Sequence, residues 1–215
     1  MKKLSGPYLD FDFAQLIPIE QSLAILPTLE QKFFQNYSDE DRSGKKRSAV
    51  LVGDPNVSYH VSYGGYKGRP LVSFSRTPIS WDLFPEVFAL KEIIEPVSKS
   101  TFNVCVIQRY PNGKVGIAPH RDKEIVQGLS DAKQDEEKIM SGKIVGFSIG
   151  ATRILRLTPP SFLTNCQFID IPLTSGSLYQ INPPTNQYWL HSIEKDPQIT
   201  EVRYSLTFRY VKPNV

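Results

Sequence analysis

The chain has 215 residues, of which 40% are hydrophobic, and this is enough to bury the core of one large domain. Its formal net charge of +3 at pH 7 is too small to identify a nucleic-acid partner and too small to exclude one. No stretch reaches the roughly 18 consecutive apolar residues of a membrane span, and Asp10 and Asp12 interrupt the N-terminus where a signal peptide would be apolar. We therefore expect a protein of a reducing compartment, the nucleus or the cytoplasm, with no membrane partner.

The first half of the chain predicts a loop and a helix. Residues 36–48 are polar, charged and contain a glycine, which is typical of an exposed loop. This loop divides the chain into an N-terminal extension, 1–48, and a main domain, 49–215. A helix is predicted between Trp81 and Val97, starting near Ser80, because apolar residues recur there at helical spacing. Its expected apolar face consists of Phe84, Val87, Phe88, Leu90, Ile94 and Val97.

From residue 102 onward, the sequence changes to short runs rich in β-formers, separated by turn-forming stretches such as "PNG" and "NPPTN". The predicted strands are 102–110, 143–150, 153–157, 167–171, 176–181 and 203–210. Such a series favours a β-sandwich or a jelly roll with helices on one side, hence an α+β fold that is mainly β. The charged segment 130–143 is expected to be a solvated loop or a short surface helix. Cys105 and Cys166 lie far apart in apolar runs, which favours buried free thiols over a metal pair.

A candidate metal site begins with His120 and Asp122. In extended backbone, residues i and i+2 project from the same face, so both side chains can reach one point. Taken alone, this pair is more often a surface hydrogen bond than a metal site. His191, in the aromatic stretch "QYWLHSI", supplies a second imidazole. Two histidines and one carboxylate leave half of an octahedral shell open, which suits Fe(II) that must also bind a co-substrate and O₂. His60 has no comparable partner and is not expected to be a ligand.

The stretch "RYSLTFRY", 203–210, alternates strictly between two kinds of residue. Aromatic and aliphatic residues from Tyr204 to Tyr210 are expected to pack into the core. The opposite face carries Arg203, Ser205, Thr207 and Arg209. Because guanidinium groups bind carboxylates through two hydrogen bonds, two arginines reaching toward a metal pocket suit a dicarboxylic acid. The alternative is that one or both are surface arginines of an edge strand.

These residues follow one another in a particular order. The HxD pair comes first, a second histidine lies 71 residues after the first, and two arginines lie 12 and 18 residues after that histidine. This order resembles that of the AlkB family of iron(II)- and 2-oxoglutarate-dependent nucleic-acid dioxygenases. The resemblance covers about residues 60–211 and is strongest to the eukaryotic-type branch that repairs alkylated DNA. It implies a double-stranded β-helix (jelly-roll) core with flanking helices, in a protein expected to be a monomer. The N-terminal 45 residues show no clear match to the family's strand-separating hairpin.

The resemblance also implies roles for individual residues. It assigns Fe(II) to His120, Asp122 and His191, and the two carboxylates of the co-substrate 2-oxoglutarate to Arg203 and Arg209. The remaining residues expected in the co-substrate pocket are Tyr110, Thr207, Gln108 and Ser205, of which the last two stand where the family usually has asparagine. An amide and a hydroxyl retain hydrogen-bonding capacity, so we expect co-substrate binding to survive with altered geometry.

For the substrate, the resemblance implies oxidative demethylation of 1-methyladenine and 3-methylcytosine in DNA, with RNA as a second candidate, releasing formaldehyde, succinate and CO₂. Expected contacts are Ser73 and Phe74, the latter stacking on an extruded base, with Glu124 at the base edge. Lys123 is a further expected contact and replaces an acidic residue common in the DNA-acting branch. Two alternatives remain: an oxygenase of the same fold acting on a protein or small molecule, and a catalytically silent binding module.

Overall fold

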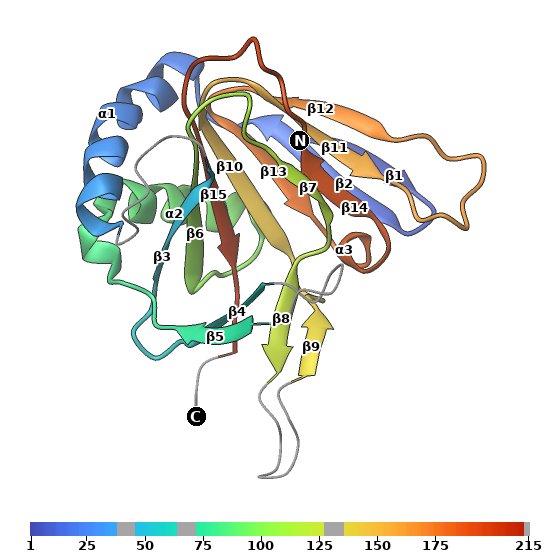
Figure 1. Ribbon diagram of the computed structural model, residues 1–215, viewed down its shortest axis with the longest axis horizontal. Coiled ribbons are helices and arrows are strands. Elements are labelled where there is room, and N and C mark those ends of the chain that lie inside the picture. Colours follow the sequence, from blue (N-terminus) through green and yellow to red (C-terminus); the bar gives the residue numbers. More distant parts are fainter. Residues whose placement is uncertain (38–45, 64–71, 127–135, 213–215) are drawn as a thin grey trace.

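The computed structural model describes residues 1–37, 46–63, 72–126 and 136–212, and only the backbone of 59–63, 72–76, 124–126 and 136–139 within these ranges. Two antiparallel sheets form the body of the protein (Figure 1). The larger sheet contains, in spatial order, β1 (Lys2–Gly6), β2 (Leu9–Gln15), β13 (Ser177–Ile181), β10 (Ile144–Gly150), β15 (Arg203–Arg209), β6 (Val104–Tyr110) and β3 (Ser48–Gly53). The smaller sheet contains β12 (Ile169–Leu173), β11 (Arg153–Thr158), β14 (Leu190–Ile193) and β7 (Ile117–His120). Two separate hairpins pair β4 (Tyr59–Tyr63) with β5 (Val72–Arg76), and β8 (Lys123–Val126) with β9 (Glu136–Ile139).

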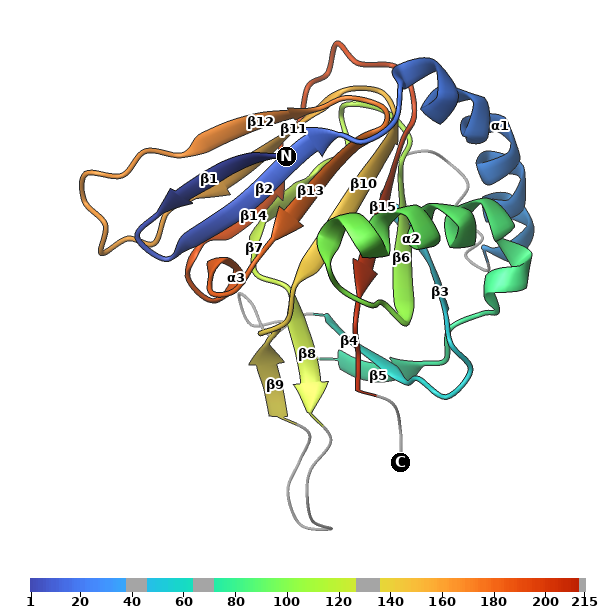
Figure 2. The ribbon, with the colours of Figure 1, turned by 180° about the vertical axis from the view of Figure 1, so that it is seen from behind.

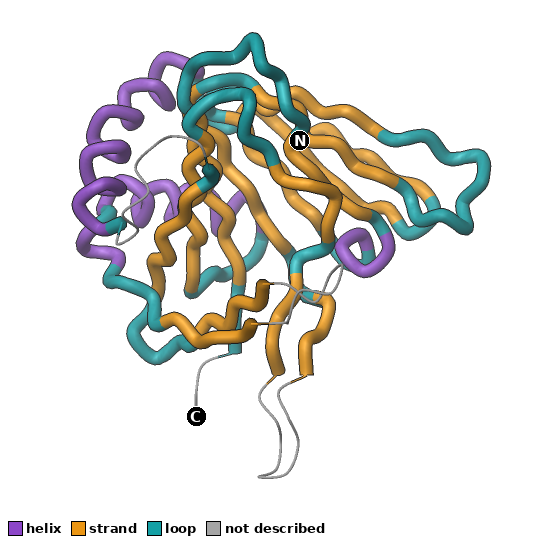
Figure 3. The backbone as a smooth tube through the Cα atoms, viewed as in Figure 1, coloured by secondary structure: helices purple, strands orange, loops and turns teal. Residues whose placement is uncertain are grey.

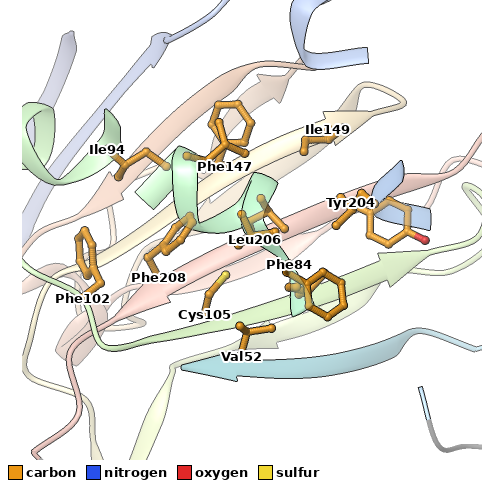
Figure 4. Packing of buried hydrophobic residues seen from close by; sticks show 14 of the residues in the cluster. Val52, Phe84, Ile94, Phe102, Cys105, Phe147, Ile149, Tyr204, Leu206 and Phe208 are labelled. Atoms are coloured by element: carbon orange, nitrogen blue, oxygen red, sulfur yellow. The ribbon is translucent and has the colours of Figure 1, made fainter. Parts of the chain in front are cut away.

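The strand β15 lies between β10 and β6 in the interior of the larger sheet, and every residue in it is buried. The predicted alternation is confirmed within the strand. Leu206 and Phe208 point to the outer face, where they join the core beneath the helices (Figure 4). Arg203 and Thr207 belong to the inner face, toward the smaller sheet. The prediction was wrong for Tyr210, which follows the strand and is 56% exposed, because the pairing that would bury it ends at Arg209.

Two long helices cover the outer face of the larger sheet (Figures 2 and 3). They are α1 (Ile19–Asn36) and α2 (Pro85–Ser98). Leu29 and Phe33 of the first helix and Leu90 and Ile94 of the second are buried in the same cluster as the outward side chains of β15. Because this cluster fills one side of the larger sheet, the other side is left to face the smaller sheet.

The predicted helix near residue 81 is confirmed, with a different start. A 3₁₀ turn, η1 (Trp81–Leu83), comes first and is capped by the Ser80 hydroxyl; α2 then begins at Pro85, which suits the first helical position because proline has no N–H to leave unbonded. Phe88 and Val97 were expected on the apolar face but are 37% and 41% exposed, since they lie on either side of the stripe that the buried residues form.

The N-terminal residues are part of the larger sheet: β2 pairs with β13, and α1 packs against β10. Neither these strands nor this helix was predicted from the sequence, and the division at residue 48 stays a prediction. Most of the predicted polar loop, residues 38–45, lies outside the described residues. Within the charged segment 130–143, Glu136–Ile139 is a strand and not a loop or helix, because it pairs with β8.

A second apolar cluster lies between the two sheets and combines residues of both, including Leu155 and Ile171 of the smaller sheet and Ile144 of the larger one. Both cysteines are free; Cys105 is buried as predicted, whereas Cys166 is only partly buried. None of the helices in the described ranges has the length and apolar character needed to cross a bilayer.

Candidate metal centre

Three side chains predicted as metal ligands meet at one end of the smaller sheet. His120 is the last residue of β7, and His191 is its direct partner across the β7–β14 pairing, with the two ring centroids 4.2 Å apart. Asp122 follows in the segment between β7 and β8, and its Oδ1 lies 3.6 Å from Nε2 of His120 and 3.9 Å from Nε2 of His191. One ligand atom from each residue lies within 4.8 Å of the others, so a single ion can bind all three.

Backbone and side-chain contacts hold these ligands in place. Nδ1 of His120 lies 2.9 Å from the carbonyl of Ala118, which favours the tautomer whose Nε2 is free for a metal. Asn186, in the short helix α3 (Thr185–Tyr188), brackets the backbone of Asp122: its Oδ1 accepts from the Asp122 N–H, and its Nδ2 donates to the Asp122 carbonyl, both at 2.9 Å. The same Nδ2 also donates to the carbonyl of Met140 at 2.8 Å. The carboxylate ligand is therefore fixed through its main chain.

Burial and neighbouring charges keep Asp122 and His191 in the protonation states that a metal requires. Burial alone would raise the pKa of Asp122, but Arg209, which donates from Nη2 to Asp122 Oδ2 at 2.6 Å, and the two histidines outweigh burial and hold this pKa well below its usual range. Burial lowers the pKa of His191 to about 4, although the nearby carboxylate opposes this shift. An ionised carboxylate and a neutral imidazole are the forms that bind divalent ions.

Arg203, on the inner face of the larger sheet, is a fully buried cation. Its Nε donates to the Ser148 hydroxyl at 3.0 Å, and Nη2 makes a longer contact of 3.4 Å with the Ser205 hydroxyl. Its Nη1 is buried and has no hydrogen-bond partner among the described residues. Burial lowers the pKa of Arg203. A buried guanidinium with an unused donor is suited to receiving a carboxylate.

The other residues predicted for the pocket lie on the same face as Arg203. Tyr110 is its direct partner in β6, with the guanidinium 5.2 Å from the ring centroid, and Gln108 pairs with Ser205 in the same ladder. The Tyr110 hydroxyl donates to Oε1 of Gln108 at 3.0 Å. Thr207 is buried on this face as well. The structure thus brings together the residues predicted to bind 2-oxoglutarate, and their individual roles stay predictions.

Arg209 lies six residues along β15 from Arg203, at the metal end of the strand, so the Cα atoms of the two arginines are roughly 20 Å apart. The carboxylate that it contacts is that of Asp122. From the sequence, this arginine was expected to bind the co-substrate, and its contact with a metal ligand was not predicted. Whether it also reaches the co-substrate stays a prediction.

The predicted substrate contacts are less well defined. Ser73 and Phe74 belong to β5 and Glu124 to β8, and their side chains lie outside the described part of the structure. Lys123, at the start of β8, is exposed. Their roles in substrate binding stay predictions.

Asn186 and Ser148 also belong to the site and were not predicted from the sequence. Asn186 falls within "NPPTN", which was interpreted only as a turn. An asparagine beside a turn gives no signal that its side chain hydrogen-bonds to the backbone of a residue 64 positions away. Ser148 lies in a strand that was predicted for its apolar residues alone.

The fold is a double-stranded β-helix with a His–Asp–His cluster at one end and a buried arginine that has an unused hydrogen-bond donor. These features define an Fe(II)-binding oxygenase site of the 2-oxoglutarate-dependent class. The sequence profile of the 2OG-Fe(II) oxygenase superfamily matches residues 13–209. The chain belongs to this superfamily and, within it, to the AlkB family. Membership implies Fe(II) and 2-oxoglutarate, and the three ligands and the unused donor of Arg203 fit them.

Individual relatives agree with this assignment. The chain is 28% identical over 173 residues to the human DNA oxidative demethylase ALKBH2, a match that covers 77% of this chain and 56% of that protein. It is 27% identical over 174 residues to bovine ALKBH2, covering 78% and 54%. It is 31% identical over 136 residues to human alpha-ketoglutarate-dependent dioxygenase alkB homolog 3, covering 60% and 44%. The matched regions thus span about half the length of these curated relatives.

A solved structure, that of OsALKBH1, superposes on 97% of this chain and 99% of its own with a TM-score of 0.54. Because the two sequences are only 12% identical, this likeness supports the fold alone.

Proposed function

We propose that this protein is an Fe(II)- and 2-oxoglutarate-dependent dioxygenase that demethylates N-alkylated nucleobases in DNA, such as 1-methyladenine and 3-methylcytosine. The observation that carries this proposal is the meeting of His120, Asp122 and His191 at one end of the smaller sheet, opposite the inner face of the larger sheet that holds Arg203. The names of the ALKBH2 relatives, DNA oxidative demethylases, support DNA as the substrate.

When bound, Fe(II) with 2-oxoglutarate and O₂ supplies the oxidation of the N-methyl group, whose carbon leaves as formaldehyde while 2-oxoglutarate becomes succinate and CO₂. The protein's own contribution is positional. His120, Asp122 and His191 would hold the metal through two imidazoles and one carboxylate. Arg203 would bind a carboxylate of 2-oxoglutarate, and the contact of Arg209 with Asp122 keeps the only anionic ligand oriented and ionised.

A methylated base cannot reach a metal held between two sheets while it is stacked in a duplex. The substrate base must therefore leave the stack or come from a single strand. Phe74 and Glu124 remain the candidate contacts for such a base, the first by stacking and the second by accepting a hydrogen bond from an exocyclic amine.

The test is formaldehyde release from oligonucleotides that carry 1-methyladenine or 3-methylcytosine, in the presence of Fe(II), 2-oxoglutarate and O₂. The proposal expects release from methylated DNA and none from the unmethylated sequence. Formaldehyde release from methylated RNA alone would mean that RNA, and not DNA, is the substrate. Succinate formation that no methylated oligonucleotide stimulates would instead indicate a protein or small-molecule substrate.

Asp122→Ala should abolish this turnover, because it removes the only anionic ligand of the cluster. Asp170→Ala is a matched control: this carboxylate is also paired with an arginine, Arg156, but lies in β12 on a partly exposed surface. The control should keep wild-type turnover. Full turnover in the Asp122 variant would contradict the metal assignment.

A further inference from the structure

Tyr179 of β13 lies on the inner face of the larger sheet, where its ring fills the space that the missing side chain of a glycine leaves. It pairs directly with Gly146 of β10, which in turn pairs with Thr207 of β15, so the three residues form one row across the sheet. A Cβ built on Gly146 would come within 2.1 Å of Cζ and 2.4 Å of the hydroxyl oxygen of Tyr179. The phenol end of the ring therefore occupies the space where a side chain of residue 146 would stand, and it extends across β10 toward β15.

The ring is held in this direction. Phe11 of β2 stacks on it almost in parallel, with centroids 5.9 Å apart and planes 9° apart. The side chain is almost completely buried, at 5% exposed. The direction of the hydroxyl is therefore set by packing on one side and by the missing side chain of Gly146 on the other.

The hydroxyl lies at the Cβ position of Gly146, and the guanidinium of Arg203 contacts Ser148, two residues further along the same face of β10, so the two groups lie on neighbouring positions of the inner face. Burial raises the pKa of Tyr179 to about 12, and the charge of Arg203 opposes this shift. Burial lowers the pKa of Arg203, and both Tyr110 and Tyr179 oppose this shift. The phenol is thus protonated at neutral pH and can donate a hydrogen bond, and no described residue accepts one from it.

We propose that Tyr179 is a further 2-oxoglutarate-binding residue, whose hydroxyl donates a hydrogen bond to the same carboxylate that Arg203 receives, and that Gly146 is a glycine because the ring needs its space. The proposal rests on the use of 2-oxoglutarate in the proposed function and not on which substrate is oxidised. Two donors converging on one carboxylate, one charged and one neutral, would fix its orientation as well as its charge.

The test measures 2-oxoglutarate binding directly, without turnover. Mn(II) replaces Fe(II), O₂ is excluded, no oligonucleotide is present, and the dissociation constant is determined by isothermal titration calorimetry. Tyr179→Phe keeps the ring and its packing on Phe11 and removes only the oxygen. Since a hydrogen bond to a charged group is lost, 2-oxoglutarate should bind about tenfold more weakly, while the affinity for Mn(II) stays unchanged.

Tyr204→Phe is the matched control, because Tyr204 is an equally buried tyrosine of the same sheet whose ring points to the outer face, against Phe33. This variant should bind 2-oxoglutarate as the wild type does. Unchanged affinity in Tyr179→Phe, with the wild type binding normally, would overturn the inference and leave the proposed function standing. A wild-type protein that does not bind 2-oxoglutarate would overturn both.

The role of Gly146 is tested by a double-mutant cycle. Gly146→Ala should weaken 2-oxoglutarate binding in the wild-type background, because the added methyl displaces the phenol. It should have little further effect beside Tyr179→Leu, whose side chain no longer reaches over residue 146. Equal losses in both backgrounds would mean that Gly146 acts independently of the ring, and this part of the inference would fail.

Discussion

Replacing Arg203 with methionine should make the metal-free and ligand-free protein more stable while removing its response to 2-oxoglutarate. This outcome is unusual, because substitution of a fully buried residue normally destabilises a protein. It is expected here because Arg203 is a buried cation whose Nη1 has no partner among the described residues. In the ligand-free protein, this unpaired buried charge lowers the free energy of unfolding, and a bound carboxylate would remove that penalty.

The magnitude follows from the contacts of the side chain. An uncompensated buried charge costs several kcal/mol, and the hydrogen bond to Ser148 and the longer contact to Ser205 return about 1 kcal/mol each. Methionine has a similar length and regains about 1 to 2 kcal/mol through apolar burial. We therefore expect the free energy of unfolding to rise by about 2 kcal/mol, which corresponds to a rise in Tm of about 4 to 8 °C.

The assay is scanning calorimetry with and without Mn(II) and 2-oxoglutarate. At a 2-oxoglutarate concentration of about 100 times its dissociation constant, the wild type should gain about 2.7 kcal/mol, and the variant should gain almost nothing beyond the effect of the metal. Arg153→Met provides a matched control, because Arg153 is also buried but donates to four backbone carbonyl oxygens. These belong to Asn112, Gly113, Val115 and Glu194. Its loss should lower stability by about 2 to 4 kcal/mol.

A destabilised Arg203→Met protein would show that this guanidinium is a structural group like Arg153. A variant that still gains full stability from 2-oxoglutarate would show that the carboxylate binds elsewhere. Either result would refute the reasoning that links the buried charge to the co-substrate.

Three further predictions concern the ligand cluster and the thiols. Asn186→Ala should weaken Mn(II) binding about 10- to 100-fold in a metal titration, because it frees the backbone of the carboxylate ligand. The control Asn165→Ala, in an exposed loop, should bind Mn(II) as the wild type does. Equal affinities in the two variants would contradict this role of Asn186. The pKa of His191 is about 4 in the folded protein and near 6.5 when unfolded, so the unfolded state binds more protons between these values. The free energy of unfolding of the metal-free protein should therefore fall by about 3 kcal/mol from pH 6.5 to 4 in urea titrations, and His191→Gln should flatten this slope; a slope unchanged in that variant would assign it to other groups. Burial raises the pKa of the Cys105 thiol, so in the native protein a thiol reagent should modify Cys166 and leave Cys105 unmodified until the protein unfolds, and rapid modification of both would contradict its burial.

Several parts of the fold could be predicted from the sequence because local patterns encode them. The alternation in 203–209 has the period of a strand, and it identified both the apolar face and the polar face that carries Arg203. The helix near residue 85 followed from apolar spacing in the same way. The helix at 19–36 was missed, because its stretch was considered only as part of an N-terminal extension. The short pairing of Glu136–Ile139 was missed because charged residues give no strand signal.

The sequence by itself determined which side chains are available for the chemistry: two histidines and an aspartate in the right order, and two arginines on one face of a strand. Only the tertiary structure decided how they meet. His120 and His191 face each other because β7 pairs with β14 in one register, Arg209 contacts Asp122, and Tyr179 extends over Gly146. The physical reason is that the register between strands far apart in the chain depends on the packing of the whole sheet, and a shift of one residue would turn each of these side chains to the opposite face.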